Sequence, residues 1–227
     1  MATKPSKRFR SIEKSCESFS LAGAVDLLKK QPGAKFDESV DVSFHLNLLK
    51  KHTVRDTIAL PHAFGKTKKI LVFAKEKKAE EARAAGADYV GDADLIAKIE
   101  GGWMDFEVAI ATPDMMKDVA RVARFLGSRG LMPSPKAKTV TLDVAQAISE
   151  VKAGRREFRA DADGVVNFSI GKKSMSSENL LDNAKEFFTA LLKKKPSDLK
   201  GDYIKSIYIS PTMGKSVKVN QRTALKG

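Results

Sequence analysis

The sequence predicts an α/β protein of two domains: an α+β domain built from both ends of the chain, and a Rossmann-like three-layer α/β domain inserted between them. Two patterns lead to this expectation. In residues 67–159, short apolar runs alternate with helix-forming stretches, which is typical of a parallel sheet covered by helices on both faces. In residues 1–66 and 160–227, extended segments alternate apolar with polar residues instead, as half-buried strands do.

The N-terminal segment predicts a helix followed by a strand. Ser20 is a suitable N-cap for a helix that runs to Lys30, and Pro32 prevents its continuation. From Val40 to Leu48 an apolar residue occupies every second position, with Asp, Ser, His and Asn between them. One face of this strand is therefore expected to pack on a core, while the other stays available to solvent or to a partner.

The central segment predicts alternating strands and helices. The strands are expected at 68–74, 87–90 and 106–111, and the helices at 75–85, 92–99, 112–126 and 142–152. Thr112 is placed to cap the third helix, with Pro113 at its first position. Gly86 and Gly154 are expected to end the first and the last helix, because glycine readily adopts the left-handed conformation found there.

The C-terminal segment returns to the pattern of the N-terminal one. Between Phe158 and Ile170 two extended stretches flank the turn at 161–164, which predicts a hairpin. A long amphipathic helix is expected at 178–195, with strands near 203–209 and 217–219. We therefore expect residues 160–227 to complete the domain begun by residues 1–66.

Charge follows the same division. The segments 1–66 and 160–227 each carry 12 basic and 7 acidic side chains, whereas 67–159 carries 17 and 14. The end-built domain thus holds +10 of a net charge of +13, and the chain has a pI near 9.7. Such an excess indicates a polyanionic partner, with nucleic acid favoured over a surface charged only for solubility.

Composition excludes several classes of protein. The chain contains no run of 18 apolar residues, which a membrane-spanning helix needs, and its basic N-terminus lacks the apolar core of a signal peptide. A cytoplasmic protein without membrane contact is therefore expected. Cys16 is the only cysteine, which excludes an internal disulfide and a cysteine-rich zinc site.

Motifs for catalysis and cofactors are incomplete. Gly65-Lys66-Thr67 resembles the end of a phosphate-binding loop, but Leu60 stands where its first glycine is needed. The stretch 171–174 fails the same test, and the three histidines lack metal-site spacing. We expect no cofactor, no metal and no catalytic residue. The rival hypothesis is a nucleotide-dependent enzyme that uses the central domain.

Two further segments leave their role open. Residues 127–136 contain two glycines, two prolines and two basic side chains, so they form a constrained loop that is either a structural connection or a basic contact surface. The stretch Thr212-Met213-Gly214-Lys215 follows an apolar strand. It is either an ordinary turn or a place where the backbone approaches a ligand closely.

Long motifs along most of the chain resemble one known family. They are FLGSRGLMPSPKAKTV at 125–140, KFDESVDV at 35–42, LPHAFGK at 60–66, DFEVAIATPDMM at 105–116 and YIKSIYISPTMG at 203–214. Together, in this order, they resemble bacterial large-subunit ribosomal protein one, the L-one family of the mobile ribosomal stalk. This resemblance implies the same two-domain fold, with one domain formed by both termini.

The resemblance also implies a function. Its members bind the stalk region of large-subunit ribosomal RNA near the exit site and assist release of deacylated tRNA. Many repress translation of their own operon messenger. The resemblance thus implies a cytoplasmic, ribosome-associated protein that is a monomer outside the ribosome and not an enzyme. A general RNA chaperone is a further alternative, and it would bind unrelated RNAs equally well.

The family's RNA-contact motifs map onto three distant segments. The matching positions are Lys35, Phe36, Ser39, Asp41, Gly171, Lys172, Ser210, Thr212, Met213 and Gly214. Phe36 and Met213 are expected to pack against riboses or bases. Lys35 and Lys172 are expected to face phosphates, while the hydroxyl and carboxylate groups bond to 2′-hydroxyls or base amino groups.

Overall fold

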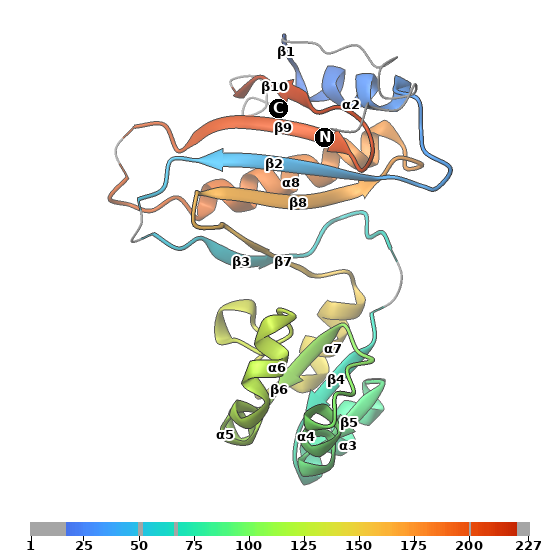
Figure 1. Ribbon diagram of the computed structural model, residues 1–227, viewed down its shortest axis with the longest axis vertical. Coiled ribbons are helices and arrows are strands. Elements are labelled where there is room, and N and C mark those ends of the chain that lie inside the picture. The colour runs from blue at the N-terminus through green and yellow to red at the C-terminus, as the bar shows by residue number, and fades with distance from the viewer. Residues whose placement is uncertain (1–16, 50–51, 66–67, 200, 222–227) are drawn as a thin grey trace, which may run out of the picture. The chain divides into compact units, whose positions relative to one another are not determined.

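The computed structural model describes residues 17–49, 52–65, 68–199 and 201–221. They form helices, strands and sheets of a mixed α/β protein (Figure 1), so the expected α/β character is confirmed. The chain divides into two compact units. Unit 1 comprises the described residues within 1–65 and 158–227, and unit 2 those within 66–157.

Unit 1 is built on a five-stranded sheet whose strand order is β1-β10-β9-β2-β8. Its strands are β1 (Ser18–Phe19), β2 (Ser39–Leu46), β8 (Val165–Lys172), β9 (Ile204–Pro211) and β10 (Val217–Val219). Neighbouring strands are antiparallel, except that β1 runs parallel to β10. β2 therefore lies between two strands from the other end of the sequence, which joins the two halves of the unit.

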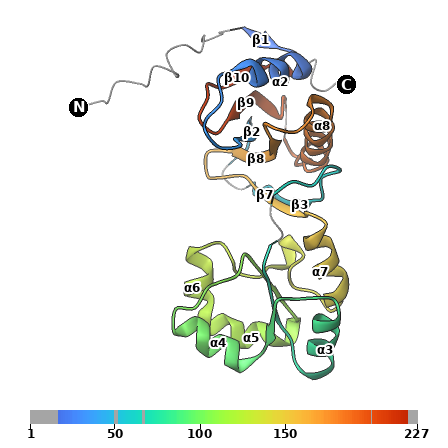
Figure 2. The same cartoon turned by 90° about the vertical axis from the view of Figure 1, so that its right-hand side faces the viewer.

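Two helices cover one face of this sheet, α2 (Leu21–Lys30) and α8 (Ser177–Lys193); Figure 2 shows the unit from the side. The alternation in β2 is complete: its inward residues are buried and its outward ones are half-buried. Phe44 packs edge-on against Phe187 and Phe188 of α8, with ring centroids 5.4 and 4.8 Å apart. Each such buried ring contributes about 1.5–3 kcal/mol of hydrophobic stabilisation.

The turn expected at 161–164 does reverse the chain, since the Asp161 N–H donates to Val165 O at 3.0 Å, but most of the pairing expected between the two arms is wrong. β7 (Arg156–Arg159) pairs with β3 (Arg55–Ile58) in a separate two-stranded sheet. Only an isolated bridge, Ala160 to Val166, joins the two arms of the expected hairpin. β8 pairs with β2 instead. Pairing with this long strand, in which apolar residues alternate with polar ones, buries more apolar side-chain surface.

Unit 2 contains a parallel three-stranded sheet in the order β5-β4-β6. Its strands are β4 (Ile70–Phe73), β5 (Tyr89–Gly91) and β6 (Val108–Ala111), and its α-helices are α3 (Glu76–Ala84), α4 (Ala93–Glu100), α5 (Met116–Val119), α6 (Ala123–Ser128) and α7 (Val144–Lys152). All four residues of the central strand β4 are buried, because helices cover both of its faces. One core lies under α4, α5 and α6, and the other under α3 and α7 (Figure 2).

The single helix expected at 112–126 is divided. The 3-10 turns η1 (Pro113–Met115) and η2 (Ala120–Val122) alternate with α5 and α6. Thr112 does not cap with its side chain. Its N–H extends the sheet by donating to Phe73 O at 3.1 Å. The buried side chains Met115, Val119, Val122 and Leu126 keep a helical spacing, so the divided segment still turns one face to the core.

Candidate nucleic-acid interface

Three strand ends meet in unit 1, because β2 begins where its two antiparallel neighbours finish. Ser39 lies opposite Lys172, Val40 opposite both Gly171 and Pro211, and Asp41 opposite Ser210. We call the ten positions that match the RNA-contact motifs the strand-end cluster: Lys35, Phe36, Ser39, Asp41, Gly171, Lys172, Ser210, Thr212, Met213 and Gly214. The sheet register brings Ser39, Asp41, Gly171, Lys172, Ser210 and Thr212 together.

Thr212 is fixed against the start of β2. Its Oγ1 accepts a hydrogen bond from the Ser39 N–H at 3.0 Å and donates to Ser39 O at 3.3 Å. The Thr212 N–H also donates to Ser39 O at 3.0 Å. The hydroxyl thus continues the pairing beyond the end of β9, and one of its lone pairs remains available to a ligand.

Lys172 joins the ends of β8 and β2 through its side chain. Its Nζ donates to Ser39 Oγ at 2.9 Å and lies 3.5 Å from Asp37 O. A lysine ammonium has three N–H groups, so it retains a donor for a phosphate. Around it, the Lys173 N–H donates to Glu38 O at 2.8 Å, and Ser174 Oγ donates to Asp37 Oδ2 at 2.8 Å. These bonds hold residues 37–39 beside 172–174.

Two glycines of the cluster lie where a side chain has no room. A Cβ at Gly171 would come within 2.3 Å of Leu180 Cδ2, and one at Gly214 within 2.4 Å of both Gln31 Oε1 and Pro211 Cγ. Gly171 is buried and allows α8 to pack against β8. Glycine at 171 is therefore needed for packing in the protein interior. Lys172 supplies the polar group at this strand end.

Two large apolar side chains of the cluster are exposed. Phe36 is 55% exposed and Met213 is 52% exposed. Phe36 precedes β2, while Met213 lies in the turn that follows β9. Lys35, next to Phe36, is exposed as well. An exposed aromatic ring next to a cation suits unstacked bases, which stack on aromatic side chains.

The outward face of the sheet continues the cluster with neutral hydrogen-bonding groups. Ser43 Oγ donates to Asn167 Oδ1 at 2.7 Å across β2 and β8. Ser169 lies opposite Asp41, and the exposed Tyr208 lies opposite Ser43. Hydroxyls and amides of this kind can exchange bonds with 2′-hydroxyls and base edges without a desolvated charge.

Sequence reasoning missed Gln31, which joins the cluster to α2. Its Nε2 donates to Lys215 O at 3.2 Å, and its Oε1 accepts from the Lys215 N–H at 3.2 Å. Lys173 Nζ donates to Gln31 O at 2.6 Å. No local sequence pattern indicates that Gln31, the C-cap of α2, would join the helix to the cluster. Its partners are 142 and 184 residues away along the chain.

Lysines around the cluster keep their charge available. Lys29 donates to Met175 O, Lys173 to Gln31 O and Lys172 to Ser39 Oγ. Among the described residues, none of these three ammonium groups has a carboxylate partner within salt-bridge distance. Neutral partners therefore position these three cations without cancelling their charge.

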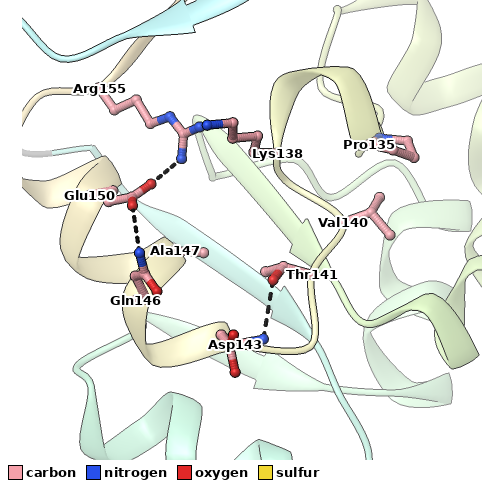
Figure 3. A pocket seen from close by; sticks show the side chains of 9 residues that line it. All are labelled: Pro135, Lys138, Val140, Thr141, Asp143, Gln146, Ala147, Glu150 and Arg155. Atoms are coloured by element: carbon pink, nitrogen blue, oxygen red, sulfur yellow. Dashed lines mark hydrogen bonds and ion pairs between the residues drawn. The ribbon is translucent and has the colours of Figure 1, made fainter.

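The described parts of the chain offer little to the rival enzyme hypothesis. They contain no His, Cys, Asp and Glu grouping suited to a metal ion. A hollow of about 260 Å³ in unit 2 is lined partly by Glu150 and Arg155, which form an ion pair there (Figure 3). Lys66 and Thr67 of the incomplete phosphate loop lie outside the described residues. No described helix is long and apolar enough to cross a bilayer.

The fold and the cluster define a class: a basic α/β protein with an exposed surface of cations, hydroxyls and apolar side chains. The chain belongs to the family described as "Ribosomal protein L1p/L10e family", whose model matches residues 28–215. It is thus a member of a family of ribosomal proteins and not an enzyme.

Curated relatives cover nearly all of the chain. It is 56% identical over 212 residues to "Large ribosomal subunit protein uL1" of Borreliella burgdorferi, which covers 93% of each chain. It is 53% identical over 222 residues to the protein of that name from Borrelia duttonii, covering 97% of this chain and 99% of the relative. The Treponema denticola protein is 51% identical over 208 residues, with 92% of each covered.

Proposed function

We propose that this protein is a structural constituent of the large ribosomal subunit that binds the stalk region of its ribosomal RNA through the strand-end cluster. The observation that carries the proposal is the convergence of three distant segments at one end of a sheet. They present Phe36, Met213, Lys35 and Lys172 together with hydroxyl groups. Family membership supplies the ribosomal context and the cytoplasmic location.

Each group of the cluster has a distinct part in this binding. Phe36 and Met213 pack against riboses or bases, and Lys35 and Lys172 contact phosphates. Thr212 Oγ1 accepts a bond from a 2′-hydroxyl while it stays bonded to Ser39. Asp41 accepts from 2′-hydroxyl or base amino groups. Ordered backbone bonds around Ser39 hold these groups in place before RNA arrives, which lowers the entropy cost of binding.

Two finer roles complete the proposal. On the ribosome the protein assists release of deacylated tRNA from the exit site. Away from it, the protein acts as a monomer that represses translation of its own operon messenger by binding a mimic of the ribosomal site. Both roles follow from the family resemblance, and the same cluster serves the ribosomal RNA and the messenger.

The test is binding of the purified protein to a stalk ribosomal RNA fragment and to a scrambled RNA of equal length, over a salt series. Wild type should prefer the stalk fragment at moderate salt. Thr212→Val should weaken stalk binding by about 1–3 kcal/mol, roughly 5- to 150-fold, because a buried partner on the RNA loses its mate. Thr212→Ser keeps the hydroxyl and should restore most of the affinity.

Thr53→Val is the matched control, because Thr53 is exposed in unit 1 outside the cluster. Thermal unfolding of each variant separates lost binding from lost folding. If wild type binds both RNAs with equal affinity, and this affinity falls steeply as the salt concentration rises, a specific ribosomal site is contradicted. That result would favour the general RNA chaperone. Unchanged stalk affinity in Thr212→Val would remove Thr212 from the interface.

A further inference from the structure

The C-terminal end of α2 lies beside the strand-end cluster. In Figure 1 the chain leaves α2 and enters β2 at the end of the sheet where β8 and β9 finish. Gln31 is the first residue after the helix, and its backbone N–H still donates to Leu27 O and Leu28 O, at 3.2 Å each. The position of Gln31 is therefore set by α2, which packs on the unit 1 core through its buried face.

The side-chain amide of Gln31 pairs with the backbone of one residue in the turn between β9 and β10. Its Nε2 donates to Lys215 O and its Oε1 accepts from the Lys215 N–H, both at 3.2 Å. A primary amide presents a donor and an acceptor side by side. It can therefore pair with both backbone groups of one residue, as the facing residue of an antiparallel strand does. Gln31 thus acts as a strand partner for the turn at Lys215.

Met213 lies between two points at which this turn is held. At one end, Thr212 is bonded to Ser39 through its N–H and its hydroxyl. At the other end, Lys215 is bonded to Gln31. Two residues, Met213 and Gly214, lie between these points along the chain. The backbone that carries the exposed Met213 side chain is therefore fixed on both sides.

The amide of Gln31 comes so close to the turn that position 214 has no room for a side chain. A Cβ at Gly214 would lie 2.4 Å from Gln31 Oε1, and as close to Pro211 Cγ. The motif match assigns Gly214 to RNA contact, yet the atoms that need this space belong to the protein. Glycine at 214 therefore permits the approach of Gln31, in addition to the contact expected of it.

The same end of α2 holds the turn between β8 and α8. Lys173 Nζ donates to Gln31 O at 2.6 Å, and Lys29 Nζ donates to Met175 O. Lys172, which is expected to face phosphate, is the neighbour of Lys173 in the chain. One helix end is thus bonded to both of the turns that flank the start of β2.

We propose that Gln31 is a positioning residue for RNA binding. Its side-chain amide holds the turn at 212–215 in the conformation that presents Met213 to the RNA, and it does so without contacting RNA itself. This inference rests on the proposed function of the strand-end cluster. A group that is held in place before binding loses less entropy on binding, so an amide outside the interface still contributes to affinity. Because Gln31 is uncharged, its contribution does not vary with salt concentration.

The first measurement is made on the free, full-length protein. Gln31→Met keeps most of the length and volume of the side chain but removes both bonds to Lys215. The bond from Lys173 is retained, because it goes to the backbone oxygen of residue 31. Amide hydrogen exchange at the Lys215 N–H should become about tenfold faster, since this N–H loses its acceptor. A wild-type exchange rate at Lys215 would show that the amide does not hold the turn, which overturns the proposal.

The second measurement is binding to the stalk ribosomal RNA fragment over a salt series, arranged as a double-mutant cycle with Met213→Ala. Gln31→Met alone should weaken binding about 5- to 30-fold, because two hydrogen bonds are lost, and the salt slope should not change. In the Met213→Ala background the same substitution should cost less than about twofold, because the side chain that it positions is gone. Wild-type affinity in Gln31→Met, or equal losses in both backgrounds, overturns the proposal.

Gln146→Met is the matched control. Gln146 is exposed on α7 in unit 2, and its amide also forms a hydrogen bond, to Glu150. This variant should bind the stalk fragment as wild type does. Thermal unfolding shows whether each variant is folded at the temperature of the assay. A wild type that binds stalk and scrambled RNA equally contradicts the proposed function and this inference with it. A selective wild type combined with any of the overturning results above removes the positioning role alone.

Discussion

At the scale of single residues, the strand-end cluster combines groups that serve the interior with groups that face outward. The hydroxyl of Thr212 forms two hydrogen bonds with the backbone of Ser39. Phe36 and Met213, in contrast, expose about half of their surface to solvent. Gly171 is one of the groups that serve the interior, because it lies buried in β8 where α8 packs against that strand. Substitution of the interior residues should therefore change stability as well as binding.

Gly171→Ala should destabilise the protein. The added methyl group would meet Leu180 Cδ2 at 2.3 Å and Met175 Sδ at 2.9 Å, and Leu180 is itself buried and cannot move aside freely. Such overpacking costs about 1–3 kcal/mol. Urea unfolding followed by circular dichroism measures the loss as a lower midpoint.

Gly127→Ala is the counterpart for this measurement. Gly127 lies in α6, and a Cβ there meets nothing within 4 Å. Alanine should stabilise that helix by about 0.5–1 kcal/mol, because it restricts the unfolded chain and favours helix. If Gly171→Ala unfolds at the wild-type midpoint, β8 and α8 can separate at little cost, and Gly171 is not required for packing.

At the scale of elements, α8 holds the segment that leaves unit 1 through a buried amide. Asn183 Nδ2 donates to His62 O at 2.9 Å and to Ile170 O at 2.8 Å, and its Oδ1 accepts from the His62 N–H at 3.0 Å. Asn183 is fully buried. One side chain thus satisfies backbone groups of a loop and of β8, the latter at Ile170, where the register of β8 with β2 shifts.

Asn183→Ala should cost about 3 kcal/mol of unfolding free energy, since buried backbone groups lose their partner at about 1–3 kcal/mol each. Asn179→Ala, at a half-buried position of the same helix, should change stability far less. Chemical denaturation of both variants gives the comparison. Similar small losses would mean that water replaces the amide and that the buried network adds little.

At the scale of the whole molecule, the two units have separate hydrophobic cores. Unit 1 holds one core, and unit 2 holds two smaller ones on the faces of its parallel sheet. Trp103 is the only tryptophan of the chain. It packs edge-on against Tyr89 in unit 2, with ring centroids 4.8 Å apart. Its fluorescence therefore reports the unfolding of unit 2 alone.

Separate cores predict separable unfolding. Asn183→Ala lies in unit 1, so it should lower a transition seen by far-ultraviolet circular dichroism while the Trp103 fluorescence midpoint stays that of wild type. Domains with their own cores commonly behave in this way. A fluorescence midpoint that falls by the same amount as the circular dichroism midpoint would show that the units unfold as one cooperative body.

Local patterns were sufficient for most elements. The strict alternation of 40–48 predicts β2, and Ser20 caps α2 with its side chain, as its position before an apolar run indicates. β1 and β3 were not anticipated, because β1 has only two residues and the first three residues of β3, Arg55, Asp56 and Thr57, are all polar and show no alternation. The pairing of β7 with β3 was missed for a related reason: a turn signal predicts reversal of the chain, but the choice of partner strand depends on competing surfaces.

Residue spacing and motif order along the chain were enough to predict the α/β class, most element positions, the basic character and the family. Only the tertiary structure decided which residues of these motifs contact one another. It joined Ser39 to Thr212 and to Lys172, 173 and 133 residues apart, and it turned Gly171 inward. Such relations follow from strand register and side-chain direction, which distant segments fix only when they pack against one another.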